Sequence, residues 1–306
     1  MQKKDLRGWW DEKVQDKYIE IGSDRICDCP KTHISCISPK EWMYNQIGVW
    51  SFKYEDRDIR KKDIHPATFP IEMARRVIEQ FSHKGELILD PFVGSGTTLV
   101  AAKDLQRNAI GFDLKPEYIE LCKNRIAQID FESILSDIKQ IPILEDARNA
   151  AQYIAPRTVK LVFTSPPYAN ILNRKRKNKS RRGDLRYNEQ FNKIEQYSQD
   201  PRDLGTMEAP VFENAIFEIF SNIKPLIKYK GHCIINITDA WIENKRVPLH
   251  INVVNAMIKA GYELRNTIIW DRRNIVNNIG IFGYPSNYIT MGTTFEYILD
   301  FWNPDR

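Results

Sequence analysis

The sequence predicts an α/β fold built on a mostly parallel sheet. Three apolar runs carry this prediction: Gly85–Asp90, Ala109–Asp113, and a run from Leu161 that stops at Ser165. Short continuous apolar runs with abrupt polar ends are typical of buried strands. Helical patterns separate these runs, as in units that alternate strands with helices. Because open parallel sheets bind ligands at the carboxyl ends of their strands, we expect the functional residues to follow these runs.

The composition is that of a globular protein. The 306 residues suffice for one large α/β domain with additions or for two domains, and 42% of them are hydrophobic and 28% charged. No apolar run approaches the ~18 residues of a membrane-spanning helix, and the charged start, Met1–Lys17, differs from a secretory signal. Five cysteines, an odd number, fit a reducing compartment better than a disulfide framework. We therefore expect a cytoplasmic protein with no membrane contact.

The run that stops at Ser165 leads directly into Pro166, Pro167 and Tyr168. Two consecutive prolines prevent both a helix and further strand pairing. A buried strand followed by a rigid turn would present a hydroxyl group, main-chain carbonyls and an aromatic ring at the edge of the sheet. An ordinary proline turn is the alternative interpretation of these residues taken alone.

A glycine-containing turn follows the strand Gly85–Asp90. Gly94 and Gly96 allow a tight turn and close approach of a ligand to the backbone before the next helix. The third glycine of a dinucleotide fingerprint is missing, and an aspartate ends the strand, which suits a cationic group better than a phosphate. Asp113 follows Asp90 by 23 residues, about the spacing at which nucleotide-binding units place an acceptor for ribose hydroxyls.

The remaining chain adds helices and strands on both sides of these motifs. Asp146 opens one further helix and is interpreted equally well as its N-cap or as a ligand. A short helix over Pro39–Trp50 would turn Trp42, Ile47 and Trp50 inward. The other expected helices cover Pro70–Ser82, Pro116–Ile129, Val211–Tyr229 and Val247–Ala260, and the other strands cover Ile141–Leu144, Gly231–Thr238, Glu263–Trp270 and Phe295–Trp302.

Three cysteines and a histidine lie within ten residues of one another. Cys27, Cys29, His33 and Cys36 would supply enough ligands for a tetrahedral zinc site. The Cys-x-Cys spacing is less usual than Cys-x-x-Cys, so free thiols packed in a loop are the alternative interpretation.

A basic segment follows the turn at Tyr168. Residues 170–205 contain 10 Lys and Arg against 5 Asp and Glu, whereas the rest of the chain is formally neutral. Such a segment is either simply solvated or in contact with the phosphates of a nucleic acid. Its densest part consists of Arg174, Lys175, Arg176, Lys177, Lys179, Arg181 and Arg182.

Three separated motifs resemble those of the amino-group (N4/N6) DNA methyltransferases, which use S-adenosylmethionine. Asp90–Thr97 is similar to the cofactor loop of this family, and Ser165–Tyr168 to its catalytic tetrapeptide in the cytosine-N4-like form. His65–Pro70 resembles the segment that closes over the methionine end of the cofactor. The resemblance covers about residues 64–302. It implies a Rossmann-like, seven-stranded, mostly parallel sheet, which is the class I methyltransferase fold.

The resemblance also implies roles for individual residues. Asp113 should bind the ribose hydroxyls of S-adenosylmethionine and Asp146 its adenine amino group, and Asp90 should lie near its methionine ammonium group. The full set of cofactor residues implied in this way is His65, Pro66, Thr68, Phe69, Asp90, Pro91, Phe92, Gly94, Ser95, Gly96, Thr97, Asp113, Leu114 and Asp146.

The implied reaction is methylation of the exocyclic amine of a base that is flipped out of double-stranded DNA. Ser165 and the Pro166 carbonyl would accept the two N–H bonds of the amine, held in place by the rigid prolines, and Tyr168 would stack on the base. Serine at the first position resembles the cytosine-N4 enzymes, with adenine N6 as the alternative target. The sequence has no Pro-Cys nucleophile of the kind that ring-carbon methylation uses.

We expect a methyltransferase domain over residues 61–306 with a basic insert at about 169–210, preceded by an irregular region, 1–60, that could hold a DNA-recognition or zinc element. Relatives with this motif order carry a recognition domain after the last strand, so recognition would here fall to residues 1–60, the insert, the loop 271–294, or a partner such as a cognate restriction nuclease. An RNA methyltransferase and a non-catalytic DNA-binding subunit are the other interpretations. The intact tetrapeptide favours an enzyme.

Overall fold

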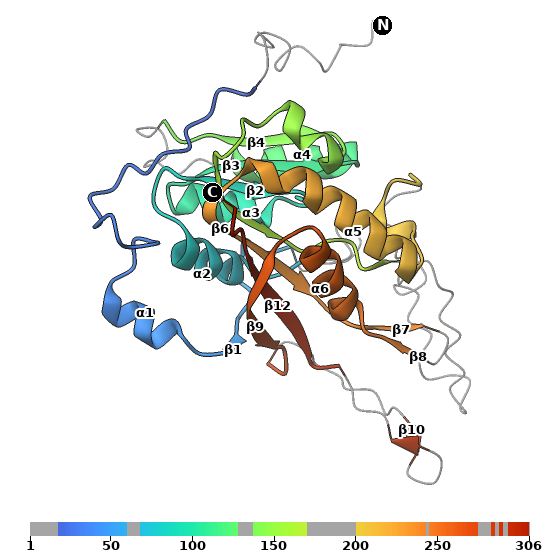
Figure 1. The fold of residues 1–306 in the computed structure, drawn as a ribbon. Helices are drawn as coiled ribbons and strands as arrows, with labels where there is room; N and C mark the ends of the chain where they lie inside the picture. The colour runs from blue at the N-terminus through green and yellow to red at the C-terminus, as the bar shows by residue number, and fades with distance from the viewer. Residues whose placement is uncertain are drawn as a thin grey trace, which may run out of the picture.

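One eight-stranded sheet forms the centre of the computed structural model, which describes residues 18–59, 68–127, 137–169, 200–242, 245–274, 283–284, 288–289 and 293–305 (Figure 1). Its strands are β1 (Val49–Ser51), β2 (Leu87–Asp90), β3 (Asn108–Asp113), β4 (Gln140–Leu144), β5 (Val159–Thr164), β6 (Ile227–Ile237), β9 (Glu263–Asp271) and β12 (Phe295–Trp302). Their order across the sheet is β1-β9-β12-β6-β5-β2-β3-β4. β12 is antiparallel to β6 and β9, and the other pairs in this sheet are parallel.

This topology confirms the predicted fold class. The seven expected strands occupy consecutive places from β9 to β4, and β9 and β12 form the expected antiparallel pair. With β12 inserted antiparallel between β6 and β9, the strand order is that of the class I methyltransferase fold. The sequence runs that end in Asp90, Asp113 and Ser165 therefore finish at the same edge of three adjacent strands.

The strand β1 was not expected. The helix predicted over Pro39–Trp50 covers only α1 (Pro39–Asn45), and the chain then becomes extended and pairs with β9. Trp50 and Phe52 point into the core, with exposed fractions of 2% and 1%, whereas Ile47 is 58% exposed. Alternate burial at Trp50 and Phe52 is the period of a strand rather than a helix, which is why the helical interpretation of this stretch is wrong beyond residue 45.

Helices cover both faces of the sheet. Alternate residues of a strand point to opposite faces, so Ile88 packs with one group of helices and Leu87 and Leu89 with the other. The first group contains α2 (Ile71–Phe81), α3 (Thr97–Asp104) and α4 (Pro116–Ile126). The second contains α5 (Ala209–Ile223), α6 (Leu249–Lys259) and the 3₁₀ helix η2 (Ala147–Gln152).

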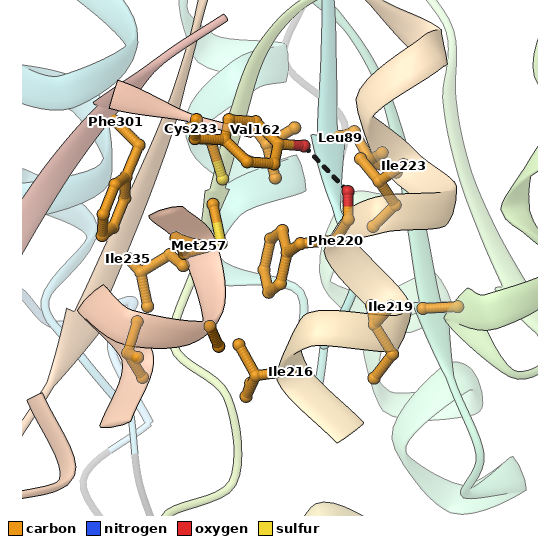
Figure 2. Packing of buried hydrophobic residues seen from close by; sticks show 14 of the residues in the cluster. Leu89, Val162, Ile216, Ile219, Phe220, Ile223, Cys233, Ile235, Met257 and Phe301 are labelled. Carbon is orange, nitrogen blue, oxygen red and sulfur yellow. Dashed lines mark hydrogen bonds between the residues drawn. The ribbon is translucent and has the colours of Figure 1, made fainter. Parts of the chain in front are cut away.

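The core under α5 and α6 is continuous with the sheet (Figure 2). Phe220 of α5 and Met257 of α6 lie over Val162 of β5 and Cys233 of β6, and these side chains are fully buried. The Tyr262 hydroxyl, also buried, donates a hydrogen bond to the Phe220 carbonyl at 3.0 Å. This packing fixes the positions of β5 and β6 relative to α5 and α6. It therefore also fixes the position of the turn that follows β5.

Two smaller differences from the sequence prediction have local causes. The helix α5 stops at Ile223 because Pro225 has no amide hydrogen to continue the α-helical hydrogen bonds, and a 3₁₀ turn, Lys224–Leu226, leads into β6. Two hairpins were not predicted: β7 (Ala240–Ile242) pairs with β8 (Lys245–Val247), and β10 (Gly283–Tyr284) with β11 (Tyr288–Ile289). None of the helices in the described ranges has the length and apolar character needed to cross a lipid bilayer.

Candidate cofactor and catalytic site

The turn predicted to be catalytic follows β5 at the carboxyl edge of the sheet. Pro166 is buried, and Ser165, Pro167 and Tyr168 are half-buried. The chain folds back sharply here, since the amide of Ala169 donates to the Pro167 carbonyl at 3.0 Å. Ser165 Oγ and Tyr168 Oη lie 3.0 Å apart, so the first and last side chains of the tetrapeptide meet.

Tyr168 is held by residues from two neighbouring strands. Its hydroxyl donates to Glu296 Oε2 of β12 at 3.0 Å, and Asn236 Nδ2 of β6 donates to the same carboxylate oxygen at 2.6 Å and to Tyr168 Oη at 3.2 Å. Arg272 completes the group by an ion pair with the other oxygen of Glu296, which is 5% exposed. The position of the Tyr168 ring is therefore fixed by hydrogen bonds as well as by packing.

Sequence reasoning did not single out Glu296, Asn236 or Arg272. The available signal was a polar residue inside each of two apolar strand patterns, Asn236 in β6 and Glu296 in β12. Because β12 is antiparallel, its amino end, where Glu296 lies, is at the same sheet edge as the carboxyl end of β6. The sequence does not show how β6 and β12 pair, so it could not place Glu296 beside Tyr168.

Asp90 joins the ends of β2 and β5. The Thr164 hydroxyl donates to its Oδ1 at 2.6 Å, and the Phe92 amide donates to the same oxygen at 3.1 Å. The side chain is 2% exposed, and this burial raises the pKa of Asp90 to about 6, although its hydrogen bonds oppose the shift. Asp90 thus ties the glycine turn to the strand that carries the tetrapeptide, and its expected contact with a methionine ammonium group stays a prediction.

The glycine turn has backbone conformations that a side chain would disturb. Gly94 and Gly96 have φ angles of +47° and +84°, in the left-handed region. A Cβ added at Gly96 would lie 2.4 Å from the sulfur of Cys122. The neighbouring polar side chains, Ser95 and Thr97, face Arg125, whose Nη1 donates to both of their hydroxyl oxygens at 3.1 Å. Their observed contacts stabilise the turn.

Asp113 ends β3 beside this turn. Its two carboxylate oxygens accept hydrogen bonds from the amides of Gly94, at 3.0 Å, and Lys115, at 2.9 Å. Burial raises the pKa of Asp113 to about 7, and the nearby charges of Asp203 and Asp90 act in the same direction. The carboxylate is therefore oriented by the backbone and half-buried.

A cleft opens at this edge of the sheet and brings the two predicted halves of the site together. Its lining includes Phe92, Leu114 and the Ser165 turn. The residues that the sequence predicted and that line the cleft are Pro91, Phe92, Gly94, Asp113, Leu114, Asp146, Ser165, Pro166 and Pro167.

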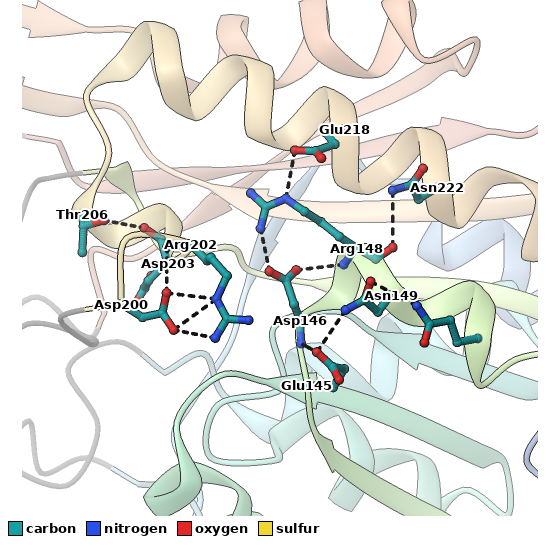
Figure 3. A network of polar contacts seen from close by, with 11 residues as sticks. Glu145, Asp146, Arg148, Asn149, Asp200, Arg202, Asp203, Thr206, Glu218 and Asn222 are labelled. Atoms are coloured by element: carbon teal, nitrogen blue, oxygen red, sulfur yellow. Dashed lines mark hydrogen bonds and ion pairs between the residues drawn. The ribbon is translucent and has the colours of Figure 1, made fainter. Parts of the chain in front are cut away.

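Asp146 has the capping role that the sequence left open. Its Oδ1 accepts from the Arg148 amide at 2.9 Å, which caps η2, and its Oδ2 pairs with Arg148 Nη1 at 2.8 Å (Figure 3). Arg148 also forms an ion pair with Glu218 of α5, with 2.9 Å between Nε and Oε2. A contact between Asp146 and an adenine amino group would have to share an oxygen that is already bonded, and it stays a prediction.

The C-terminal part of the basic insert contributes further lining residues. Arg202, Asp203 and Leu204 line the cleft, and none of them was predicted. Asp203 Oδ1 accepts from the Gly205 amide at 2.8 Å, while Arg202 is paired with Asp200 at 2.7 Å (Figure 3). Sequence reasoning missed these residues because their approach to the cleft depends on the path of the insert.

Several predicted residues lie elsewhere or outside the described part of the chain. Thr68 and Phe69 precede α2: the Thr68 hydroxyl donates to the Ile59 carbonyl at 2.7 Å, and Phe69 packs on Phe163 with ring centroids 5.1 Å apart. His65 and Pro66 lie outside the described residues, as do Arg174, Lys175, Arg176, Lys177, Lys179, Arg181 and Arg182.

The predicted thiol cluster forms, with one change of member. Cys27, Cys29 and Cys36 come together with His83, which precedes β2, rather than with His33. His33 contributes its main-chain carbonyl, which lies 2.9 Å from His83 Nε2. The prediction that the His33 side chain is the fourth member is wrong. The fold instead brings in His83, which lies 47 residues after Cys36 in the sequence.

Comparison with known proteins places this architecture in a family. A model described as DNA methylase matches residues 9–124, and a model described as D12 class N6 adenine-specific DNA methyltransferase matches residues 72–212. The chain is 37% identical over 113 residues to the type II methyltransferase M.HpaI of Haemophilus parainfluenzae, covering 36% of each protein. Over these residues the chain is similar to amino-group DNA methyltransferases. It spans only about a third of the length of the curated relative that it matches here.

Other relatives show the same partial coverage. It is 38% identical over 91 residues to the type II methyltransferase M.BglI of Bacillus subtilis, covering 29% of this chain and 25% of that one. Among solved structures it is similar to TrmN from Thermus thermophilus, with a TM-score of 0.47 and 13% identity over 80% of this chain and 52% of that one. A SAM-dependent O-methyltransferase from Thermotoga maritima gives 0.42 and 10% over 78% and 67%.

S-adenosylmethionine is the methyl donor of this family, and the cleft fits its nucleoside part. The half-buried Asp113 carboxylate is held at the end of β3 and lines the cleft, where it would accept hydrogen bonds from vicinal hydroxyls. Phe92 and Leu114 supply apolar surface for a flat base next to it. Gly94, whose amide donates to Asp113, also lines the cleft and adds no side chain to it.

Proposed function

We propose that this methyltransferase moves a methyl group from S-adenosylmethionine to the exocyclic amine of a flipped base in double-stranded DNA, and that the amine is cytosine N4. The observation that carries the proposal is the meeting of Asp113 and the Ser165 turn in one cleft. A nucleoside held by Asp113 and a base held by the turn would approach each other along the edge of adjacent parallel strands. Catalysis by such an enzyme depends largely on this positioning.

The residues that would hold the cofactor are Asp113 for the ribose, and Phe92 with Leu114 for the adenine. Bound there, S-adenosylmethionine supplies an electrophilic methyl group on a sulfonium. Asp90 lies behind the cleft and keeps the Phe92 amide and Thr164 in place through its Oδ1. The glycine turn and the tetrapeptide are thereby held in one arrangement before substrates arrive.

The hydrogen-bond pattern around Tyr168 makes Ser165 an acceptor toward the base. Tyr168 has a single hydroxyl proton, and it is donated to Glu296. The proton between Tyr168 and Ser165 must therefore come from Ser165, whose Oγ lies 3.0 Å away. Both lone pairs of Ser165 Oγ then remain for an N–H of the amine, and the Pro166 carbonyl would take the other N–H. Acceptors fixed in advance favour the pyramidal nitrogen that attacks the methyl group.

Adenine N6 is the second candidate target. It is favoured by the match to the D12 class N6 adenine-specific model over residues 72–212. Ser165 at the first position of the tetrapeptide favours cytosine N4 by resemblance. In both cases the acceptors, the stacking ring and the cofactor residues are the same, so only the identity of the base differs.

Mass spectrometry of the product distinguishes the two targets. Duplex DNA of mixed sequence is incubated with the full chain and S-adenosylmethionine, digested to nucleosides and analysed. We expect N4-methylcytosine, with no new N6-methyladenine or 5-methylcytosine. Appearance of N6-methyladenine would leave the site in place and change the base. If RNA of the same sequence is methylated and duplex DNA is not, the proposed substrate is wrong.

We propose that the basic residues from Arg174 to Arg182 contact the DNA backbone, because they follow the catalytic turn directly and carry no acid among them. A cognate restriction nuclease is the proposed partner, since both curated relatives described above are type II methyltransferases. Purification from cells that express the chain together with its neighbouring genes tests the association. Recovery of the chain free of any nuclease would contradict it.

A further inference from the structure

The N-terminal segment, residues 18–36, crosses the corner between α2 and β2 and is hydrogen-bonded there. The Ile26 amide donates to the Lys84 carbonyl at 2.9 Å. Gly85, with a φ angle of +85°, allows the segment to lie flat, since a Cβ there would be 2.5 Å from the Asp24 carbonyl oxygen. The thiols of Cys27 and Cys36 are thereby brought against His83, two residues after the end of α2.

The distances in this cluster are those of a metal site. Cys27 Sγ and Cys36 Sγ are 3.6 Å apart, too far for a disulfide, and His83 Nδ1 lies 3.3 and 3.5 Å from them. Tetrahedral zinc with ordinary bond lengths of about 2.3 Å to sulfur and about 2.0 Å to nitrogen requires edges of about 3.8 Å between sulfurs and about 3.5 Å between sulfur and nitrogen. Cys29 Sγ completes the group, with all four ligand atoms within 4.8 Å of one another.

The surroundings of the cluster suit a bound metal. The second ring nitrogen of His83 lies 2.9 Å from the His33 carbonyl, which requires a proton on Nε2 and leaves the lone pair of Nδ1 facing the thiols. Ligating histidines almost always make such a bond to an outer partner. The Lys84 amide donates to Cys36 Sγ at 3.4 Å. Arg107, 2% exposed, interacts electrostatically with Cys27 and Cys36 and would offset the single negative charge of zinc with three thiolates.

We propose that Cys27, Cys29, Cys36 and His83 bind a structural zinc ion that fastens the N-terminal segment to the methyltransferase core. Four protein ligands leave no open position for a substrate, as in structural rather than catalytic zinc sites. The site lies at the amino end of β2, whereas the cofactor cleft lies at the carboxyl end. Zinc is therefore expected to stabilise the fold and to leave the affinity for S-adenosylmethionine unchanged.

The direct test is metal analysis of the full chain purified without chelator, with two histidine variants as a matched pair. The parent should contain one zinc ion per chain. His83→Gln should lose the metal, whereas His33→Gln should retain it, because His33 contributes only its main-chain carbonyl. Cobalt(II) in place of zinc should give the intense visible bands of a tetrahedral site and thiolate charge-transfer bands, and both should disappear in His83→Gln.

Each outcome bears on the proposal. A parent without zinc, and without a tetrahedral cobalt spectrum after cobalt is added, would show that the cysteines are free thiols. Loss of metal in His33→Gln with retention in His83→Gln would restore the set expected from the sequence and overturn the one proposed here. To separate metal loss from misfolding, binding of S-adenosylmethionine is measured in His83→Gln, and its affinity should equal that of the parent. The melting temperature should fall both in His83→Gln and in the parent after a chelator has removed the zinc.

Discussion

Replacing Asp113 by asparagine tests the assignment of the cofactor site. The carboxylate would accept two hydrogen bonds from ribose hydroxyls, and a hydrogen bond to a charged group contributes ~1.5–3 kcal/mol. Asparagine keeps one acceptor oxygen and loses the charge, so at least one such bond is lost. At 1.4 kcal/mol per tenfold, the dissociation constant of S-adenosylmethionine should rise by ~10- to 100-fold.

The parent protein should also show a pH dependence that the variant lacks. Burial raises the pKa of Asp113 to about 7, and ribose binding requires the ionised form. Binding then releases a proton below pH 7, so the affinity falls as the pH falls, by ~10-fold for each unit below the pKa. Above pH 8 the carboxylate is ionised and its contribution is constant. The ratio of the two dissociation constants should therefore be largest above pH 8 and shrink toward pH 6.

Isothermal titration calorimetry with S-adenosylmethionine at pH 6 to 8.5 measures both effects. Taking the ratio of parent to variant cancels the titration of the ligand's own amino group. Asp104→Asn is the control, since Asp104 pairs with Arg57 and Arg75 away from the cleft and should leave affinity and pH profile unchanged. Parent affinity in Asp113→Asn, or a ratio independent of pH, would refute the assignment.

Three further predictions concern the base and the DNA. Ser165→Ala should lower the methyl-transfer rate by ~10²-fold or more with nearly unchanged cofactor affinity, since one preorganised acceptor is removed; single-turnover rates equal to those of the parent would exclude the proposed role. Tyr168→Phe should slow methyl transfer by ~5- to 10-fold because the hydrogen bond to Ser165 is removed. Tyr168→Ala should in addition weaken capture of the flipped base by ~1–3 kcal/mol, and the fluorescence of a 2-aminopurine target measures this capture. Alanine at the four basic residues from Arg174 to Lys177 should weaken binding to all DNA sequences alike and reduce the slope of log affinity against log salt by ~0.9 for each phosphate that is no longer neutralised; an unaltered slope in filter binding would mean that this segment is only solvated.

The parts of the site that lie at strand ends could be predicted from sequence. Asp90, Asp113 and Ser165 each end a short apolar run, and parallel strands with helical connections leave only one edge at which these ends meet. The spacing of the two aspartates predicts a ribose-binding role for Asp113, and that role stays a prediction. Such predictions need only the local pattern and the general rule for parallel sheets.

The parts that depend on distant pairings could not be predicted. Glu296 reaches Tyr168 because β12 enters the sheet in the opposite direction, and His83 replaces His33 because the N-terminal segment crosses the α2–β2 corner. In each case the residue is far away in sequence and carries no motif of its own. The strand β1 was missed for a related reason: three residues are too few to show a period, and their burial comes from pairing with β9.

The late position of β12 in the chain has a consequence for the order of folding during synthesis. Tyr168 and its partner Glu296 are separated by 128 residues, and the intervening chain includes β6 and β9, the two strands between which β12 is inserted. The strands that end at Asp90 and Asp113, and the turn at Tyr168, are all synthesised before α5, whereas Glu296 is synthesised after β9. The hydroxyl of Tyr168 has no carboxylate to donate to until the last strand pairs. The contact that fixes the Tyr168 hydroxyl would thus form only on completion of the sheet, in one of the last steps of folding.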